Sequence, residues 1–126
     1  MQDHRQLRVW HDAQQLCVRI YLLSADFPVE ERFGLVAQVR RAAISIGSNI
    51  AEASRRASRP DKARILNVAQ CEAAEVMSEL DIAGRLGYRG QEAAQELIAR
   101  YDRLEAGLER LRQRVLAGGD EQNESV

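Results

Sequence analysis

The sequence of 126 residues predicts an all-α protein, folded as an antiparallel up-down-up-down four-helix bundle. Two prolines and few runs of β-branched residues argue against a sheet. Apolar residues recur at helical spacing in four long stretches. Short links containing proline or glycine separate these stretches, and short links place consecutive helices antiparallel. We expect one domain over residues 1–117, long enough to bury a core.

The first helix is predicted over residues 7–25. Val18 and Leu22 lie off its core face, which indicates burial beyond a single subunit. A proline at position 28 ends the helix region, because proline disfavours helical geometry in the residue before it. We expect Phe27 and Phe33 to close this end of the bundle. The predicted core face consists of Trp10, Ala13, Cys17, Ile20 and Tyr21.

The second helix is predicted over residues 30–57, and its apolar surface is broad. One stripe faces the core. A second stripe holds Ile44, Gly47 and Ala51, with Arg40 and Arg55 beside it. The two stripes together cover roughly 200° of the helix, against about 100° for a helix packed on one core. Glycine inside a helix costs about 1 kcal/mol relative to alanine, so we expect close approach of another backbone at position 47.

A third stripe of the second helix is polar, and two interpretations stay open. Glu52 precedes Arg56 by four residues, the favourable order for an ion pair within a helix. The stripe is then a solvated face with local pairs. Alternatively it forms a polar network buried in a subunit interface, with Arg41, Asn49 and Glu52 as members.

The third helix is predicted over residues 61–86, after Pro60, which is tolerated in a first turn. Besides its core face it has a second apolar line of Val68, Ile82 and Leu86. Glu75 falls within that line, and a carboxylate among apolar neighbours is costly unless it is paired. We therefore predict an ion pair between Glu75 and Arg41.

The fourth helix is predicted over residues 91–117, and a polar, acidic tail over 118–126 is expected to be disordered. The apolar residues of this helix form one narrow seam at alternating spacings of three and four. Such a seam predicts packing on one side only. Its members are Ala94, Leu97, Tyr101, Leu104, Leu108, Leu111 and Val115.

The formal net charge of −1 hides an asymmetry along the chain. Residues 40–64 contain seven basic against two acidic side chains, whereas residues 71–126 contain seven against twelve. Such a basic stretch is typical of a binding surface, but also of complementarity within or between subunits. No aromatic residue lies between the arginines, so nucleic acid would be bound by its backbone. The candidates are Arg40, Arg41, Arg55, Arg56, Arg59, Lys62 and Arg64.

No constellation of catalytic, metal-binding or cofactor-binding residues is apparent. We therefore expect that the protein is not an enzyme and that it binds no cofactor. Glu72, Glu75 and Glu79 lack the Glu-x-x-His motif of di-iron bundles. Cys17 and Cys71 occupy apolar helical positions and are expected to be reduced and buried. The N-terminus lacks the apolar region of a signal peptide, and no apolar run is long enough to span a membrane. A cytoplasmic protein is therefore expected.

Four features of the sequence resemble a known bacterial family: Trp10, IYLLSADFP (20–28), FGLVAQVRRAAISIGSNIAEASRR (33–56) and SELDIAGRLGY (78–88). They are similar to the four-helix-bundle proteins called 23S rRNA intervening-sequence proteins or S23 ribosomal proteins, over residues 7–115. The resemblance implies a left-handed bundle that assembles as a homopentamer. It also implies a relation to the accessory protein of diversity-generating retroelements, and hence a basic surface for RNA or DNA. Departures from the family pattern are Ala53, where glycine is frequent, and Cys71-Glu72, where Gly-Ser is frequent.

The function predicted from the sequence is a non-enzymatic, oligomeric bundle that acts as an interaction scaffold for a protein partner. The alternative is binding of an RNA or DNA backbone through the basic patch on the second helix and the start of the third. Candidates for a subunit interface or buried polar network are Arg41, Ile44, Gly47, Asn49, Ala51, Glu52 and Glu75.

Overall fold

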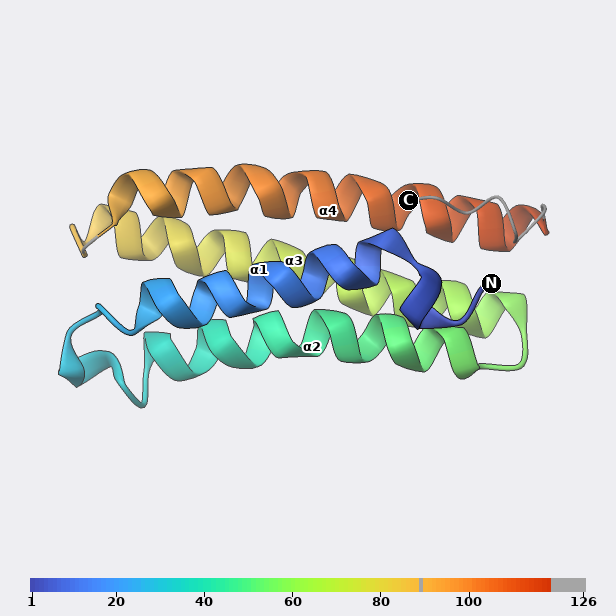
Figure 1. The fold of residues 1–126 in the computed structure, drawn as a ribbon, viewed down its shortest axis with the longest axis horizontal. Coiled ribbons are helices and arrows are strands. Elements are labelled where there is room, and N and C mark those ends of the chain that lie inside the picture. The colour runs from blue at the N-terminus through green and yellow to red at the C-terminus, as the bar shows by residue number, and fades with distance from the viewer. Residues whose placement is uncertain (89, 119–126) are drawn as a thin grey trace.

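Four α-helices account for most of the computed structural model, which describes residues 1–88 and 90–118. α1 spans Arg8–Ser24, α2 Leu35–Arg55, α3 Arg59–Arg85 and α4 Gln91–Ala117. The helices lie side by side, and the chain reverses direction at each connection (Figure 1). Each helix packs on the next, and α1 also packs on α4. The described residues contain no strand, so the predicted all-α, four-helix architecture is confirmed, while the left-handed twist stays a prediction.

The second helix begins later than predicted. A single 3-10 turn spans Val29–Glu31, and α2 starts only at Leu35. The Glu31 carboxylate accepts a hydrogen bond from the Leu35 backbone N–H at 3.2 Å, so it satisfies one of the free donors at the start of α2 from outside the helix. α3 starts earlier than predicted, at Arg59, because Ser58 caps it by accepting from the Asp61 N–H at 3.2 Å.

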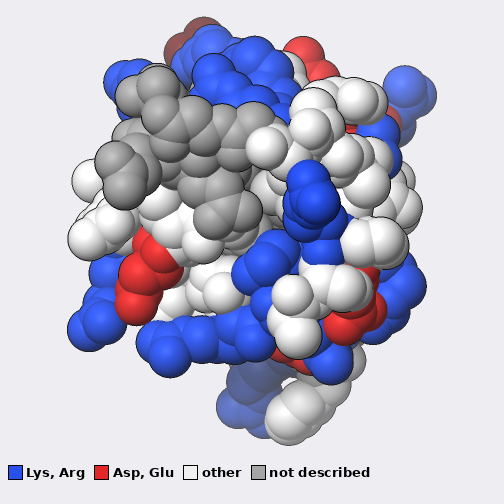
Figure 2. Space-filling view, turned by 90° about the vertical axis from the view of Figure 1, so that its right-hand side faces the viewer, with Lys and Arg blue, Asp and Glu red and all other residues white. Residues whose placement is uncertain are grey.

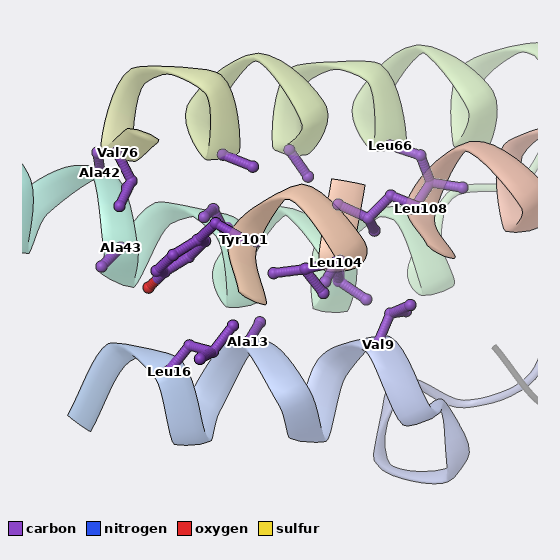
Figure 3. Packing of buried hydrophobic residues seen from close by; sticks show 14 of the residues in the cluster. Val9, Ala13, Leu16, Ala42, Ala43, Leu66, Val76, Tyr101, Leu104 and Leu108 are labelled. Carbon is purple, nitrogen blue, oxygen red and sulfur yellow. The ribbon is translucent and has the colours of Figure 1, made fainter. Parts of the chain in front are cut away.

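The apolar seam of α4 forms the centre of the core, as predicted. All seven of its members are at most 4% exposed. Figure 3 shows Val9, Ala13 and Leu16 of α1 directed toward Tyr101 and Leu104 of α4. Because this seam is narrow, the helix packs on one side and presents mainly charged residues on the other.

Gly47 of α2 lies against side chains of α1 rather than against another backbone. A Cβ atom at this position would collide with Oε1 of Gln14, and Nε1 of Trp10 would lie 3.8 Å away. The prediction of a close contact is therefore right, but its partner is a side chain of the same subunit. Gly47 is buried in the contact between α1 and α2 and is not available to a second subunit.

Phe27 and Tyr88, but not Phe33, close the end of the bundle near the α1–α2 connection. The Phe27 and Tyr88 rings lie 5.5 Å apart, and the Tyr88 hydroxyl donates to Oε2 of Glu31 at 2.6 Å. Phe33 is 84% exposed, so its predicted role is wrong. Because α2 starts after it, Phe33 belongs to the connection, where the Arg32 guanidinium covers its ring at 4.6 Å.

The two cysteines are less buried than predicted. Cys17 is half-buried, and its burial raises the pKa of its thiol. Cys71 is exposed, because α3 turns Ala69, Gln70 and Ala73 into the bundle and leaves position 71 at the rim. Both cysteines are free thiols.

Tyr101→Phe is expected to stabilise the protein by about 1–2 kcal/mol, the cost of an unsatisfied buried polar group. The Tyr101 side chain is fully buried, and its hydroxyl has no hydrogen-bond partner among the described residues. Urea unfolding at fixed protein concentration measures the change. Leu108→Ala, which removes a fully buried side chain from the same seam, should instead lose about 2–5 kcal/mol. A less stable Tyr101→Phe protein would show that the hydroxyl is satisfied in solution.

Candidate interaction surfaces

Most of the basic stretch predicted from the sequence, namely Arg55, Arg56, Arg59, Lys62 and Arg64, lies at the end of the bundle where α2 passes into α3. Arg40 and Arg41 lie near the start of α2, toward the other end. Figure 2 views the end at the α2–α3 connection and shows basic side chains around it, with acidic side chains among them. Three of the arginines there have carboxylate partners. Arg56 donates to Glu52 at 2.6 Å, Arg64 to Asp61 at 2.8 Å, and Arg55 lies 3.6 Å from Asp3. Most of the local positive charge is therefore neutralised within the subunit.

Two further members of the stretch make hydrogen bonds inside the molecule. Arg40 donates to the Ser24 hydroxyl at 2.8 Å and to the Tyr21 carbonyl at 3.2 Å, and its guanidinium covers the Tyr21 ring at 4.4 Å. Lys62 donates to the Ser54 carbonyl at 3.3 Å. Arg40 and Lys62 thus tie neighbouring segments together. Arg59 is the one member of the predicted set that is exposed and forms no hydrogen bond or ion pair with a described residue.

The predicted ion pair between Glu75 and Arg41 is confirmed. Arg41 donates to Oε1 of Glu75 at 2.8 Å, and its other nitrogen lies 3.9 Å from Oε2 of Glu72. One turn further along α3, Glu79 is only 6% exposed. Burial, reinforced by the charge on Glu75, raises the pKa of Glu79 to about 7. Burial and the nearby Glu75 also raise the pKa of Glu72.

The polar stripe of α2 makes local contacts within the subunit. The Asn49 amide donates to the Ser45 hydroxyl at 3.1 Å, and Glu52 is paired with Arg56. Ala51 is half-buried, and Ile44 is 47% exposed on the outer side of the helix. These contacts agree with the interpretation of local pairs, and the role of the stripe in a subunit interface stays a prediction.

Large apolar side chains are exposed over three of the four helices. α1, the α1–α2 connection, α2 and α3 with the residue that ends it contribute nine of them, and α4 contributes only one. Exposed apolar side chains on neighbouring helices are candidates for an interaction site. The residues are Val18, Tyr21, Leu22, Val29, Phe33, Ile44, Val68, Ile82 and Leu86, with Leu116 on α4.

A groove between α1 and α4, with a volume of about 640 Å³, was not predicted from the sequence. Arginines line both of its sides: Arg8 and Arg19 come from α1, and Arg100, Arg103 and Arg110 from α4. The α4 arginines belong to residues 71–126, where acids outnumber bases. A charge count by segment concealed them, since it does not separate the faces of a helix. Placing 100, 103 and 110 on a helical wheel would have shown one basic stripe.

A comparison with protein-family models matches residues 5–110 to the 23S rRNA-intervening sequence proteins. The chain belongs to this family. A crystal structure from the S23 ribosomal protein family, of a Bacteroides thetaiotaomicron VPI-5482 protein described as having unknown function, is similar over 82% of this chain and 97% of that one. The two are 27% identical, with a TM-score of 0.74. A search of curated proteins found no match. The relation to the retroelement accessory protein stays a prediction.

The described part of this 23S rRNA-intervening sequence protein gives no indication of catalysis. The fold does bring His4 near Ser54, a pair that the sequence did not suggest, with 3.5 Å between Nδ1 and the hydroxyl oxygen. Asp3 approaches the same ring nitrogen at 3.6 Å, and the Ser54 hydroxyl donates to the Ala51 carbonyl. A catalytic triad needs the serine and the aspartate on opposite ring nitrogens.

Among residues 1–88 and 90–118, no group of three metal-ligating side chains converges. No helix formed by these residues has the length and apolar character needed to cross a bilayer.

Glu79→Gln is expected to stabilise the protein at pH 8 and to change little at pH 4.5. In the folded state the Glu79 carboxyl keeps its proton up to about pH 7, against 4.5 for an unperturbed glutamate. Between these values the folded state binds more protons, so the free energy of unfolding falls as pH rises. Urea unfolding of both proteins from pH 4.5 to 8 tests this. Asp102→Asn, at an exposed site on α4, is the control. A stabilisation by Glu79→Gln that is constant with pH would contradict the assignment.

A double-mutant cycle on Arg41 and Glu75 is expected to give a coupling energy of about 0.5–1 kcal/mol, the upper range for a partly exposed pair. Arg41→Ala and Glu75→Ala are measured singly and together by urea unfolding. Additive effects would show that the 2.8 Å contact contributes nothing in solution.

Proposed function

We propose that this 23S rRNA-intervening sequence protein is a non-enzymatic subunit of a homo-oligomer that serves as an interaction scaffold in the bacterial cytoplasm. The exposed apolar surface of α1–α3 is the observation that supports the proposal most. Val29 is 71% exposed, Leu22 67% and Val18 61%. A monomer would leave these side chains in water. Burying one of them fully in an interface would contribute about 1.5–3 kcal/mol to the free energy of association.

A second copy of the chain is the partner that fits this surface best. α2 packs between α1 and α3, so apolar side chains of α1 and of α3 lie on either side of it. A head-to-tail contact uses two different faces of each subunit, and repeated contacts of this kind form a ring when the rotation between subunits closes. α4 has one exposed large apolar residue, Leu116, so this helix would face solvent in the assembly. The subunit number of five comes from the family resemblance alone.

The ion pair between Arg41 and Glu75 lies on the surface that the proposed contact would cover. Ile44 follows Arg41 by one turn of α2, and Ile82 follows Glu75 by two turns of α3. Arg41 is 60% exposed in the subunit, so assembly would remove an already paired charge from water. A paired polar group in an apolar contact penalises wrong registers, since any shift leaves a buried charge unpaired.

The alternative, nucleic-acid binding through residues 40–64, has less support. Arg41, Arg55, Arg56 and Arg64 have carboxylate partners, and Arg40 and Lys62 are engaged in hydrogen bonds that tie segments together. Of the seven candidates, Arg59 alone has no hydrogen bond or ion pair with a described residue. A phosphate bound there would have to compete with carboxylates already in place.

Ile82→Glu is expected to disrupt the oligomer, because it places a charge on the surface proposed to be buried. Light scattering coupled to gel filtration at micromolar concentration measures the mass, expected to be a multiple of 14.2 kDa for the wild type and to fall for the variant. Leu116→Glu is the matched control, because Leu116 on α4 has the same 46% exposure as Ile82.

The control should retain the wild-type mass. A wild-type protein that is monomeric at these concentrations would refute the proposed assembly. So would an Ile82→Glu protein with unchanged mass, since a buried unpaired carboxylate is strongly unfavourable at an interface.

A further inference from the structure

The groove between α1 and α4 contains many arginines and few acidic side chains to pair with them. Five arginines line it, against one acid, Asp12. Glu96 lies beside the groove and is shared by Arg19 at 3.3 Å and Arg100 at 3.1 Å. Five positive charges against these two acids leave three in excess. Arg8, Arg103 and Arg110 form no ion pair or hydrogen bond with any described residue.

The arginines form two facing rows. Arg8 and Arg19 are eleven residues apart on α1, and Arg100 and Arg110 are ten apart on α4, so each row extends for about 15 Å at 1.5 Å per residue. The helices are in contact along the floor, where a Cβ at Gly107 would lie 3.1 Å from Val9 Cγ1 and 3.6 Å from Arg110 Nη2. The glycine thus lets α1 come close and leaves room for the Arg110 guanidinium.

The floor of the groove offers almost no apolar surface to a ligand. Val9 is 2% exposed, Leu16 5% and Leu104 4%, because they belong to the core. An amphipathic peptide helix binds by burying its apolar face, and the mostly polar lining of this groove suits that face poorly. What a ligand meets is guanidinium groups, whose planar donors match phosphate oxygens in pairs.

We propose that the α1–α4 groove binds the phosphodiester backbone of a single-stranded nucleic acid. The two arginine rows flank the strand, and Arg8, Arg103 and Arg110 bind phosphates without first releasing a carboxylate. The lining contains no aromatic residue, so bases are not stacked and the binding is independent of sequence. Helices in contact have axes about 8–10 Å apart, so the space between the two rows suits the backbone of a single strand.

This site differs from the stretch 40–64 and from the apolar surface of α1–α3. The groove contains charged residues of α4, the helix with the least exposed apolar surface. The α4 row of the groove therefore lies outside the surface proposed for assembly and would be repeated once in every subunit. Repetition raises the affinity for a long strand through multivalent contact.

The test is fluorescence anisotropy with a labelled 20-nucleotide oligo(dU) from about 50 to 200 mM salt, a range in which phosphate contacts change affinity strongly. The groove variant replaces Arg8, Arg103 and Arg110 by glutamine. It is expected to bind more than tenfold more weakly at the lowest salt. The slope of log affinity against log salt should fall by about two, since each phosphate contact on a single strand contributes about 0.7.

The matched control replaces Arg55, Arg56 and Arg64 by glutamine, which removes the same charge from arginines that have carboxylate partners. It should bind nearly as the wild type does. Absence of wild-type binding at the lowest salt would overturn the proposal, as would equal losses in the two variants. A 20-residue oligoglutamate or a duplex that displaces the strand equally well would overturn it too. Gel filtration of each variant shows whether it keeps the wild-type oligomeric size, so that loss of assembly is not mistaken for loss of the binding site.

Discussion

Burial of the α4 seam is the constraint on which the rest of the structure depends. Tyr101, Leu108 and Leu111 are fully buried, and α4 contacts both α3 and α1. An amphipathic helix with only one narrow apolar seam can be oriented in only one way, because any rotation would bring charged residues into the core. That orientation also decides where the charges of α4 lie. Its basic stripe comes to lie beside α1, and Glu105 and Glu109 meet Gln70 of α3 at 3.0 and 2.9 Å.

The net charge of a segment is a poor guide to the charge available for binding. Residues 40–64 have the largest basic excess of the chain, yet acids from the same subunit neutralise much of it. α4 lies in an acidic segment and nevertheless supplies Arg103 and Arg110, which pair with none of the described residues. Charge that is already paired contributes little to attracting a ligand, whereas unpaired guanidinium groups on one groove act together.

Two carboxylates of α3 are poorly solvated. Glu72 Oε2 and Glu79 Oε1 are buried without a hydrogen bond from the described residues, next to the surface proposed for assembly. Each costs stability in an isolated subunit. The buried core of the subunit offsets these costs. Covering the exposed apolar side chains of α1–α3 in the proposed assembly would add to the stability.

Much of the fold follows from the sequence alone, because each helix has a periodic apolar face that depends only on local spacing. The α4 seam and the bounds of α4 were predicted correctly, and so was the contact of Arg41 with Glu75. The start of α2 and the exposure of Phe33 were not, since a side-chain cap by Glu31 decided them. The broad apolar surface of the first three helices is also visible in the sequence.

Tertiary structure decided the pairing of charges and the place of the groove. Asp3 reaches Arg55 across 52 residues of sequence, and Arg8 faces the arginines of α4 only because α1 closes the bundle against it. Helical periodicity gives the direction of a side chain around its own axis, but not which helix lies opposite. The sequence therefore determined four helices and their buried faces. Packing determined the pairs between distant segments, such as Arg55 with Asp3, and placed Arg8 opposite Arg103 and Arg110 in the α1–α4 groove.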